Sequence, residues 1–265
     1  MGDVPVVITI RAPSGRKEKA FHVMDDAFQL AREIENEVSE FVPSSDTFHL
    51  NSVKIKEEVF IRPHLLKILL SAEQVSLRTE GAFDVTFASR NRAASFRDLQ
   101  INQDRSTVLI DRRGIKIGVS GIAKGYIVDR MSEFLNENGF SSHLVNAGGD
   151  LMAHGVWRIG IRDPLSDRIL CSLDLQDQAA STSGLYERGR HLFDPRLKGP
   201  VENPDFLSVT VIGNACFDTD PLSTAGFMVG RRGVERLISR FFGVSLIVVD
   251  QKGRVDSYPT IGLCR

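Results

Sequence analysis

Two short apolar runs flank a pair of glycines in the stretch His143-Leu144-Val145-Asn146-Ala147-Gly148-Gly149-Asp150-Leu151-Met152-Ala153. Consecutive glycines in this setting are typical of the tight turn of a β-hairpin, because glycine adopts positive φ without strain. A hairpin joins antiparallel strands directly, whereas parallel strands need a long crossover. The glycines would also let a ligand approach the backbone closely, but the turn alone explains them. This stretch therefore predicts an antiparallel sheet.

Periodicity elsewhere in the chain places helices around such a sheet. Apolar residues recur at three- and four-residue steps over 20–38, and a second helical segment opens at Pro63 and closes near Gly81. A hairpin is predicted over 107–119, turning at 112–114. Further helices are predicted over 122–134 and 233–242, and further strands over 6–10, 157–161, 169–175, 207–212 and 244–249. Strands joined by short turns and mixed with helices favour an α+β fold with largely antiparallel sheets, and we expect one domain over residues 1–265.

The composition is that of a globular chain without a strongly charged character. Its 265 residues are 42% hydrophobic and 25% charged, which suffices for a full core. The formal net charge of -1 provides no general attraction to nucleic acid or to an anionic membrane, so we expect neither as a partner. The three cysteines form no CxxC pair, which argues against a zinc site and a disulfide framework. The N-terminus resembles neither a signal peptide nor a lipoprotein leader, so we expect a cytoplasmic protein.

A carboxylate precedes a hydroxyl by four residues in the run Asp220-Pro221-Leu222-Ser223-Thr224. Four residues are about one helical turn, so both oxygens would lie on one face of a helix. Pro221 suits the first helical position, which predicts Asp220 as the N-cap. Taken alone, the pair is explained by an ordinary cap. Two hard oxygen ligands at this spacing also suit Mg²⁺, which takes few protein ligands and completes its octahedron with water and phosphate.

Two glycine-containing segments are candidates for ligand binding. A glycine-spaced turn over 118–126 runs into a helix with Lys124 in its first turn, and such a turn presents backbone amides and helix dipole to an anion. It matches no nucleotide-binding fingerprint, and a plain tight turn is an equal explanation. In the segment 81–86, Phe83 would support a planar ring and Asp84 would accept hydrogen bonds from ligand hydroxyls, although packing at the start of a strand explains both equally well.

The segment 181–196 is dense in functional side chains, with hydroxyls, a carboxylate, three arginines and His191. The ordinary pKa of histidine, about 6.5, lets it accept a proton from a hydroxyl near neutral pH. His191 is therefore a candidate general base, although a lone histidine is more often structural.

Seven motifs follow one another along nearly the whole chain. They are Ser39-Glu40-Phe41 through Leu50-Asn51, Gly81-Ala82-Phe83-Asp84-Val85-Thr86, Gly121-Ile122-Ala123-Lys124-Gly125-Tyr126, Val145-Asn146-Ala147-Gly148-Gly149-Asp150-Leu151, Thr182-Ser183-Gly184 with Tyr186-Glu187-Arg188, His191-Leu192-Phe193-Asp194-Pro195-Arg196, and Asp220-Pro221-Leu222-Ser223-Thr224-Ala225. In this order they resemble the ApbE family, the FAD:protein FMN transferases. The resemblance implies a T-fold-like architecture.

The resemblance also implies a reaction: transfer of the FMN half of FAD to a threonine or serine hydroxyl of an acceptor flavoprotein, with AMP as the leaving group and Mg²⁺ as the cofactor. Carried over by motif, the metal ligands would be Asp220, Thr224 and the backbone carbonyl of Gly121, with Ser223 close by. His191 would be the catalytic base. The residues expected to contact FAD are Phe41, Ala82, Phe83, Asp84, Lys124, Leu192 and Phe193.

The chain departs from the family pattern in the part that recognises FAD. An acid usually stands three residues before the position of Gly121, and this chain has Gly118 there. Phe41 replaces a common tyrosine, which keeps the ring face and loses a hydroxyl. Two other outcomes therefore remain open: hydrolysis of FAD to FMN and AMP at the same site, and a flavin-binding protein without catalysis.

Overall fold

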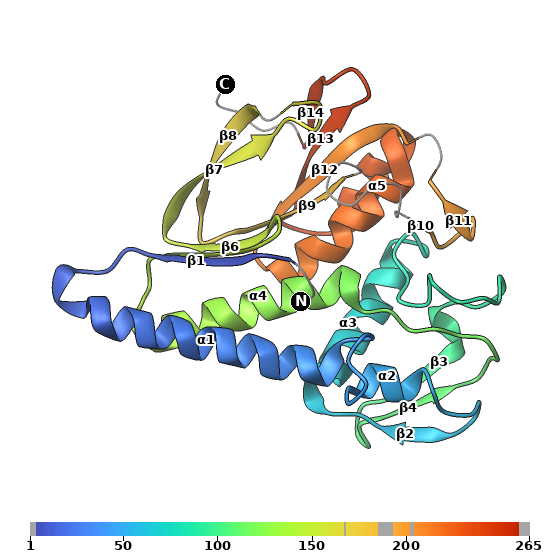
Figure 1. Ribbon diagram of the computed structural model, residues 1–265. Coiled ribbons are helices and arrows are strands. Elements are labelled where there is room, and N and C mark those ends of the chain that lie inside the picture. The colour runs from blue at the N-terminus through green and yellow to red at the C-terminus, as the bar shows by residue number, and fades with distance from the viewer. Residues whose placement is uncertain (1–3, 167, 185–192, 202–203, 260–265) are drawn as a thin grey trace.

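The protein is described by a computed structural model that covers residues 4–166, 168–184, 193–201 and 204–259. A seven-stranded sheet forms its upper part in Figure 1, and every neighbouring pair of its strands is antiparallel. In spatial order the strands are β1 (Val6–Ile10), β5 (His143–Ala147), β6 (Asp150–His154), β9 (Ala179–Gly184), β12 (Phe206–Gly213), β13 (Ser245–Asp250) and β14 (Val255–Tyr258). The predicted α+β class with largely antiparallel sheets is confirmed.

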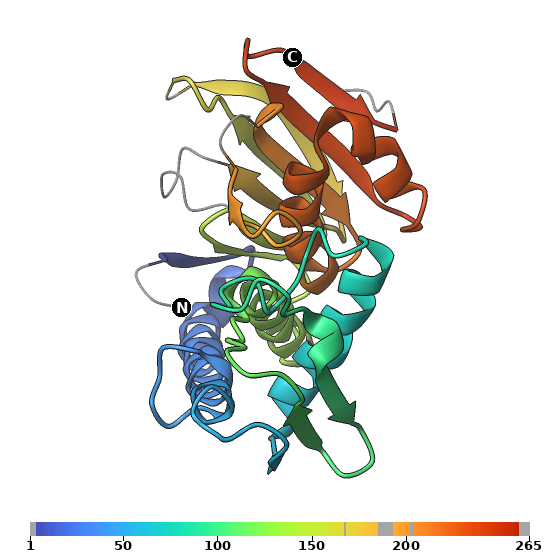
Figure 2. The ribbon, with the colours of Figure 1, turned by 90° about the vertical axis from the view of Figure 1, so that its right-hand side faces the viewer.

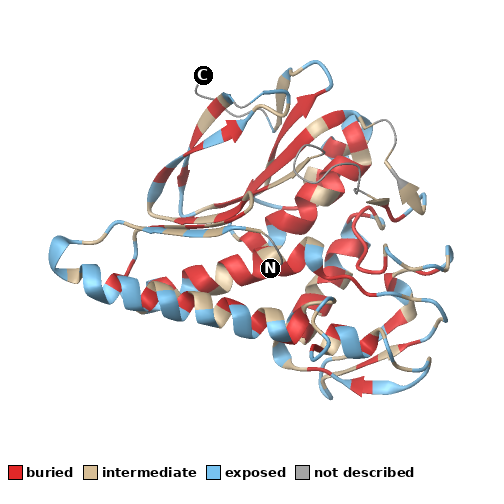
Figure 3. Ribbon diagram, viewed as in Figure 1, coloured by how far each residue is buried: buried red, intermediate tan, exposed pale blue. Residues whose placement is uncertain are grey.

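Two long helices pack on one face of this sheet. α5 (Cys216–Ile238) contacts β9 and β12, and α4 (Ser120–Glu137) contacts β5, β6 and α5. α1 (Lys17–Val38) lies along α4 on the side away from α5, as the view along both helices in Figure 2 shows. Figure 3 shows the result as an inner helix α4 that is largely buried and an outer helix α1 with an exposed stripe.

Close contact between α4 and α5 depends on one glycine. A Cβ atom at Gly125 would lie 2.2 Å from the carbonyl oxygen of Cys216 and 2.8 Å from the Cβ of Asp220. No side chain fits in that space, so the two helix backbones approach each other directly. This contact places the N-terminal part of α5 against the first turns of α4, where the candidate site residues lie.

A hairpin of β7 (Val156–Arg162) and β8 (Ile169–Gln176) covers part of the other face of the sheet. Burial alternates along β7, as expected for a strand with one apolar face. Its inward side chains form an apolar cluster with Leu151, Ile212 and Ile247 of the large sheet.

The lower part in Figure 1 is built from α2 (Asp46–Leu50), α3 (Pro63–Arg78) and a small sheet in the order β2 (Glu58–Phe60), β4 (Thr107–Ile110), β3 (Leu99–Asn102). Short 3-10 helices span Ser14–Arg16 and Phe96–Asp98, and β10 (Phe193–Asp194) pairs with β11 (Gly199–Pro200).

One apolar core runs from α1 through α3 and α4 to β13. Among the described helices none is both long and apolar enough to cross a bilayer.

Two of the predicted elements differ from the structure. The strand partner of β4 is β3, which precedes it, and residues 111–119 form no strand, so the hairpin predicted over 107–119 does not exist. The turn lies at 103–106 instead. The helix predicted over 233–242 is the second half of α5, which ends at Ile238 and is kinked at Gly230, where φ is 63°. The helices predicted over 20–38, from Pro63 and over 122–134, and the hairpin at Gly148-Gly149, are confirmed.

Candidate functional site

A pocket opens where the hairpin turn of β5 and β6, the first turn of α4 and the first half of α5 meet. The loop 82–87 and the segment 193–195 complete its wall. The lining residues come from segments far apart in the chain: Val4, Ala82, Phe83, Asp84, Phe87, Gly118, Ser120, Gly121, Lys124, Gly148, Asp150, Thr182, Ser183, Gly184, Phe193, Pro195, Asp220, Thr224 and Met228.

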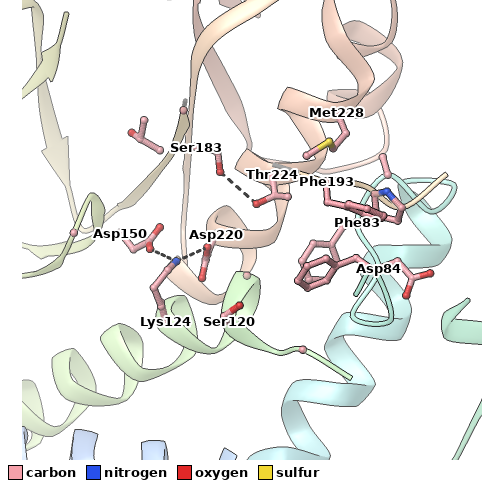
Figure 4. A pocket seen from close by; sticks show the side chains of 18 of the residues that line it. Phe83, Asp84, Ser120, Lys124, Asp150, Ser183, Phe193, Asp220, Thr224 and Met228 are labelled. Atoms are coloured by element: carbon pink, nitrogen blue, oxygen red, sulfur yellow. Dashed lines mark hydrogen bonds and ion pairs between the residues drawn. The ribbon is translucent and has the colours of Figure 1, made fainter. Parts of the chain in front are cut away.

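One end of the pocket is charged. Lys124 Nζ donates to Asp150 Oδ2 at 2.5 Å and to Asp220 Oδ1 at 3.0 Å, so one ammonium group lies between two carboxylates (Figure 4). The second oxygen of Asp220 accepts from the backbone N–H of Gly125 at 3.0 Å. Both carboxylates are almost fully buried.

Burial and the neighbouring carboxylates shift the pKa of Lys124 in opposite directions. Burial lowers the pKa of Lys124, but the attraction of Asp220 and Asp150 outweighs it and raises that pKa above its ordinary value. Burial, together with the neighbouring Asp220 carboxylate, raises the pKa of Asp150. The lysine therefore stays charged and partly neutralises two carboxylates held close together.

Hydroxyl groups lie next to the carboxylates. Ser183 Oγ of β9 is 2.7 Å from Ser223 Oγ and 3.3 Å from Thr224 Oγ1 of α5, and Ser223 Oγ donates to the carbonyl oxygen of Asp220 at 2.8 Å. Asp220 and Thr224 both line the pocket from consecutive turns of one helix. The four-residue spacing thus brings these oxygens to one face, as expected. Ser223 is buried behind them and does not line the pocket.

The predicted cap at Asp220 is wrong. α5 begins at Cys216, four residues earlier, and Asp220 and Pro221 lie within the helix. The carboxylate that caps it is Asp129 of α4, which accepts from the backbone N–H groups of Cys216 at 2.9 Å and Phe217 at 2.8 Å. Burial raises the pKa of Asp129 to about 7, against the lowering effect of these two hydrogen bonds. Capping from another helix leaves Asp220 free to face the pocket.

The other end of the pocket is aromatic. Phe83, Phe87 and Phe193 line it together with Met228, and the ring centroids of Phe87 and Phe193 are 6.3 Å apart. Ala82, fully buried, lines the same wall. Aromatic and thioether side chains favour contact with a planar ring. The pocket therefore combines a place for charge with a place for a flat apolar group.

Asp84 lines the pocket but is occupied by its own loop. Its Oδ1 accepts from the backbone N–H and the hydroxyl of Thr86, both at 2.7 Å, and its Oδ2 accepts from the N–H of Phe96 at 3.1 Å. These bonds fix the loop that carries Phe83 and Phe87. A direct contact between Asp84 and FAD stays a prediction.

The remaining predicted residues are placed differently. Gly121 lines the pocket, and a Cβ there would lie 3.3 Å from the ring of Phe83. Phe41 does not line the pocket and is 77% exposed, in the loop after α1. His191 and Leu192 lie outside the described residues.

Several lining residues carry no functional signal in the sequence. Asp150 follows the glycine pair as part of the hairpin motif, but its role as a second carboxylate depends on β6 lying beside α5. Phe87 and Met228 are marked only by being apolar. Within the described ranges, no cluster of three or more histidine, cysteine or acidic side chains forms a metal site.

Comparisons with known proteins agree with this architecture. The profile of the ApbE family matches residues 3–248. A protein of Klebsiella pneumoniae named FAD:protein FMN transferase is 27% identical over 235 residues, which is 77% of this chain and 74% of that protein. A Vibrio cholerae protein of the same name is 25% identical over 264 residues, covering 85% and 79% of the two chains.

Among solved structures, the ApbE protein of Thermotoga maritima superimposes with a TM-score of 0.81 at 25% identity, covering 96% of this chain and 92% of that one. The flavin transferase ApbE from Vibrio cholerae gives a TM-score of 0.77 at 22% identity, covering 97% of this chain and 100% of that one, which shows a shared fold. With a family match over nearly its whole length, and with the fold of solved ApbE proteins, this chain belongs to the ApbE family.

Proposed function

We propose that this protein is an FAD:protein FMN transferase. The observation that carries the proposal is the pocket itself, in which Lys124 between Asp150 and Asp220 forms one end and Phe83, Phe87 and Phe193 form the other. A dinucleotide such as FAD has the matching parts, a charged diphosphate and flat rings. The names of the relatives in Klebsiella and Vibrio support the same activity.

The donor set at the charged end fits Mg²⁺. Asp220, Asp150 and Thr224 supply hard oxygens at one place, and an ammonium group already lies between the two carboxylates, where a cation is favourable. Asp220 and Thr224 would hold the ion, with the Gly121 carbonyl as a third ligand and Ser223 close by. Ser183 Oγ contacts the hydroxyls of both Ser223 and Thr224. When bound, Mg²⁺ would neutralise phosphate oxygens as charge develops on them.

The reaction is a phosphoryl transfer, in which the protein contributes positioning and charge stabilisation. The oxygen of an acceptor threonine or serine forms a bond to the phosphorus of the FMN half, and the bond from that phosphorus to the oxygen of AMP breaks. The proton of the acceptor hydroxyl passes to His191, and AMP leaves with the electron pair. Lys124 remains protonated and attracts the diphosphate. The aromatic end holds a ring and keeps water from it.

The test measures AMP and the flavin separately. Purified protein is incubated with FAD and Mg²⁺, with and without a candidate acceptor flavoprotein and that acceptor with its hydroxyl residue changed to alanine. Transfer predicts AMP release together with a covalently fluorescent acceptor band that the alanine acceptor lacks. AMP release that no acceptor stimulates would instead identify hydrolysis of FAD, and bound FAD without AMP would identify a carrier. EDTA should stop the reaction if Mg²⁺ is required.

A further inference from the structure

The carboxylate of Glu40 lies near the pocket and takes no part in the site described above. Glu40 is the second residue after α1, in a loop whose backbone is held by side-chain hydrogen bonds. Ser45 Oγ donates to the carbonyl oxygen of Ser39 at 2.5 Å, and Thr47 Oγ1 donates to that of Val38 at 2.7 Å. These bonds join the two residues before Glu40 to residues that follow it, and so close the loop that carries Glu40.

The end of the same segment is tied to the pocket wall. Asn51 accepts from the N–H of Ile117 through Oδ1 at 2.7 Å and donates to its carbonyl oxygen through Nδ2 at 2.8 Å. The residue after Ile117 is Gly118, which lines the pocket, and its N–H donates to the carbonyl oxygen of Val85 at 2.8 Å. The two-way bond of Asn51 thus holds the 39–51 segment beside Gly118.

Glu40 points at this wall. A Cβ atom at Gly118 would lie 3.3 Å from Glu40 Oε1 and 3.1 Å from the ring of Phe87. Glu40 is not itself a lining residue, so its carboxylate reaches the pocket only through the gap at Gly118, which it shares with the Phe87 ring. Glu40 is partly buried, and within the described ranges it makes no hydrogen bond or ion pair through its carboxylate. A partly buried carboxylate without a partner has hydrogen-bonding capacity left for a ligand.

The position of Glu40 decides which part of a bound ligand its carboxylate could contact. Phe87 belongs to the aromatic end of the pocket, whereas Lys124, Asp150 and Asp220 form the charged end. A carboxylate repels phosphate, so it suits the edge of a heteroaromatic ring, which carries N–H or amino donors. We propose that Glu40 accepts a hydrogen bond from a ring N–H or amino group of the dinucleotide bound at the aromatic end, in the space left by Gly118. This inference rests on the proposed function, because FAD is taken as the ligand.

The proposal is testable because it predicts weaker FAD binding on removal of the Glu40 charge, whereas charge repulsion alone predicts unchanged or tighter binding. FAD carries negative charge on its diphosphate, so removing a nearby negative charge without losing a contact would leave its binding unchanged or tighten it. The isosteric variant Glu40→Gln keeps an oxygen acceptor but replaces a charge-assisted hydrogen bond by a weaker neutral one, so it should instead weaken FAD binding about tenfold. Titration calorimetry with FAD, FMN and AMP in EDTA measures binding without turnover. The matched control is Glu57→Gln, which removes the same charge from an exposed residue that has no atom among those nearest the Gly118 position and should bind FAD like the wild type.

The comparison of half-ligands identifies the ring. A loss confined to FAD and to one of FMN or AMP supports the proposal and assigns the contact to that half. Unchanged or tighter FAD binding in Glu40→Gln, or an equal loss for FMN and AMP, overturns it. If the wild type itself binds FAD neither in EDTA nor with Mg²⁺, the proposed function fails rather than this inference.

The second test moves the carboxylate from residue 40 to residue 118. Gly118 does not adopt positive φ, so Gly118→Asp introduces no backbone strain of that kind. Its Cβ would lie 3.1 Å from the Phe87 ring, so the ring must shift slightly to admit an acid near the position of the Glu40 carboxylate. Added to Glu40→Gln, it should restore most of the FAD affinity. Binding that stays weak in a double variant as thermally stable as Glu40→Gln would mean that the loss came from packing at residue 40, and the assignment would fall.

Discussion

Replacing Gly125 by alanine tests whether direct backbone contact between α4 and α5 builds the charged end of the pocket. The new methyl group would lie 2.2 Å from the carbonyl oxygen of Cys216, 2.7 Å from its carbonyl carbon and 2.8 Å from Cβ of Asp220. None of these atoms can rotate away, because two belong to the backbone and the third is attached to it. Relief of the overlap requires the two helices to separate by roughly 1 Å, to an ordinary contact distance.

Two energies oppose each other in this variant. Alanine in a helix interior is favoured over glycine by about 1 kcal/mol. Overpacking of a rigid contact costs about 3 kcal/mol, at the upper end of the usual range, because backbone atoms must move. The net loss of about 2 kcal/mol corresponds to a fall in Tm of roughly 4–8 °C for a chain of this size. Separation of the helices also lengthens the hydrogen bond from Gly125 N–H to Asp220 Oδ2, which is 3.0 Å here.

Thermal unfolding and Mg²⁺-dependent release of AMP from FAD measure the two effects. We expect Gly125→Ala to melt at lower temperature and to release AMP more slowly. The control is Gly15→Ala, because no atom lies within 4 Å of the position of its new methyl group. A Gly125→Ala protein that melts at or above the wild-type temperature and retains the wild-type rate would refute the reasoning.

Three further substitutions address the site and its support. Asp220→Asn should remove Mg²⁺-dependent AMP release while circular dichroism stays that of the wild type; normal activity would contradict the metal assignment. His191→Ala should lower the rate of transfer at saturating FAD more than it weakens FAD binding, and the reverse pattern would make His191 a binding residue. Because burial raises the pKa of Asp129 from 3.8 to about 7, the folded state favours its neutral form, so its contribution to stability is present below about pH 4 and lost as pH rises through 7. Asp129→Asn should therefore flatten the fall in the free energy of unfolding between about pH 4 and pH 7, measured by urea denaturation, and an unchanged slope would contradict this origin.

Sequence patterns over a few residues predict those features of the site that depend only on neighbouring residues. The four-residue spacing of Asp220 and Thr224 sets both oxygens on one face of a helix wherever that helix begins. The glycine pair before Asp150 specifies a hairpin, since the turn needs positive φ at two successive positions, and φ is 60° at Gly148 and 94° at Gly149. These properties depend on a few consecutive residues.

The predictions are wrong where a residue far away in the sequence determines the local structure. A carboxylate followed by proline predicts a cap at Asp220 from its neighbours alone, whereas the actual capping group, Asp129, lies 87 residues before Cys216. β9 escapes prediction because its Ala-Ala-Ser-Thr-Ser-Gly sequence lacks large apolar residues. Small side chains suit this strand because it lies between β6 and β12 and under α5. The strand partner of β4 is likewise a matter of tertiary pairing.

The ammonium group between two carboxylates has a consequence for the order of binding. With both carboxylates ionised, Lys124 acts as an internal counter-ion in the free protein and leaves one excess negative charge shared by Asp150 and Asp220. A divalent cation alone would reverse the sign of that group, and a diphosphate alone would add to its negative charge. Only the two together return the group to the charge balance of the free protein. Metal and dinucleotide should accordingly bind with positive cooperativity, each raising the affinity of the other by the same factor.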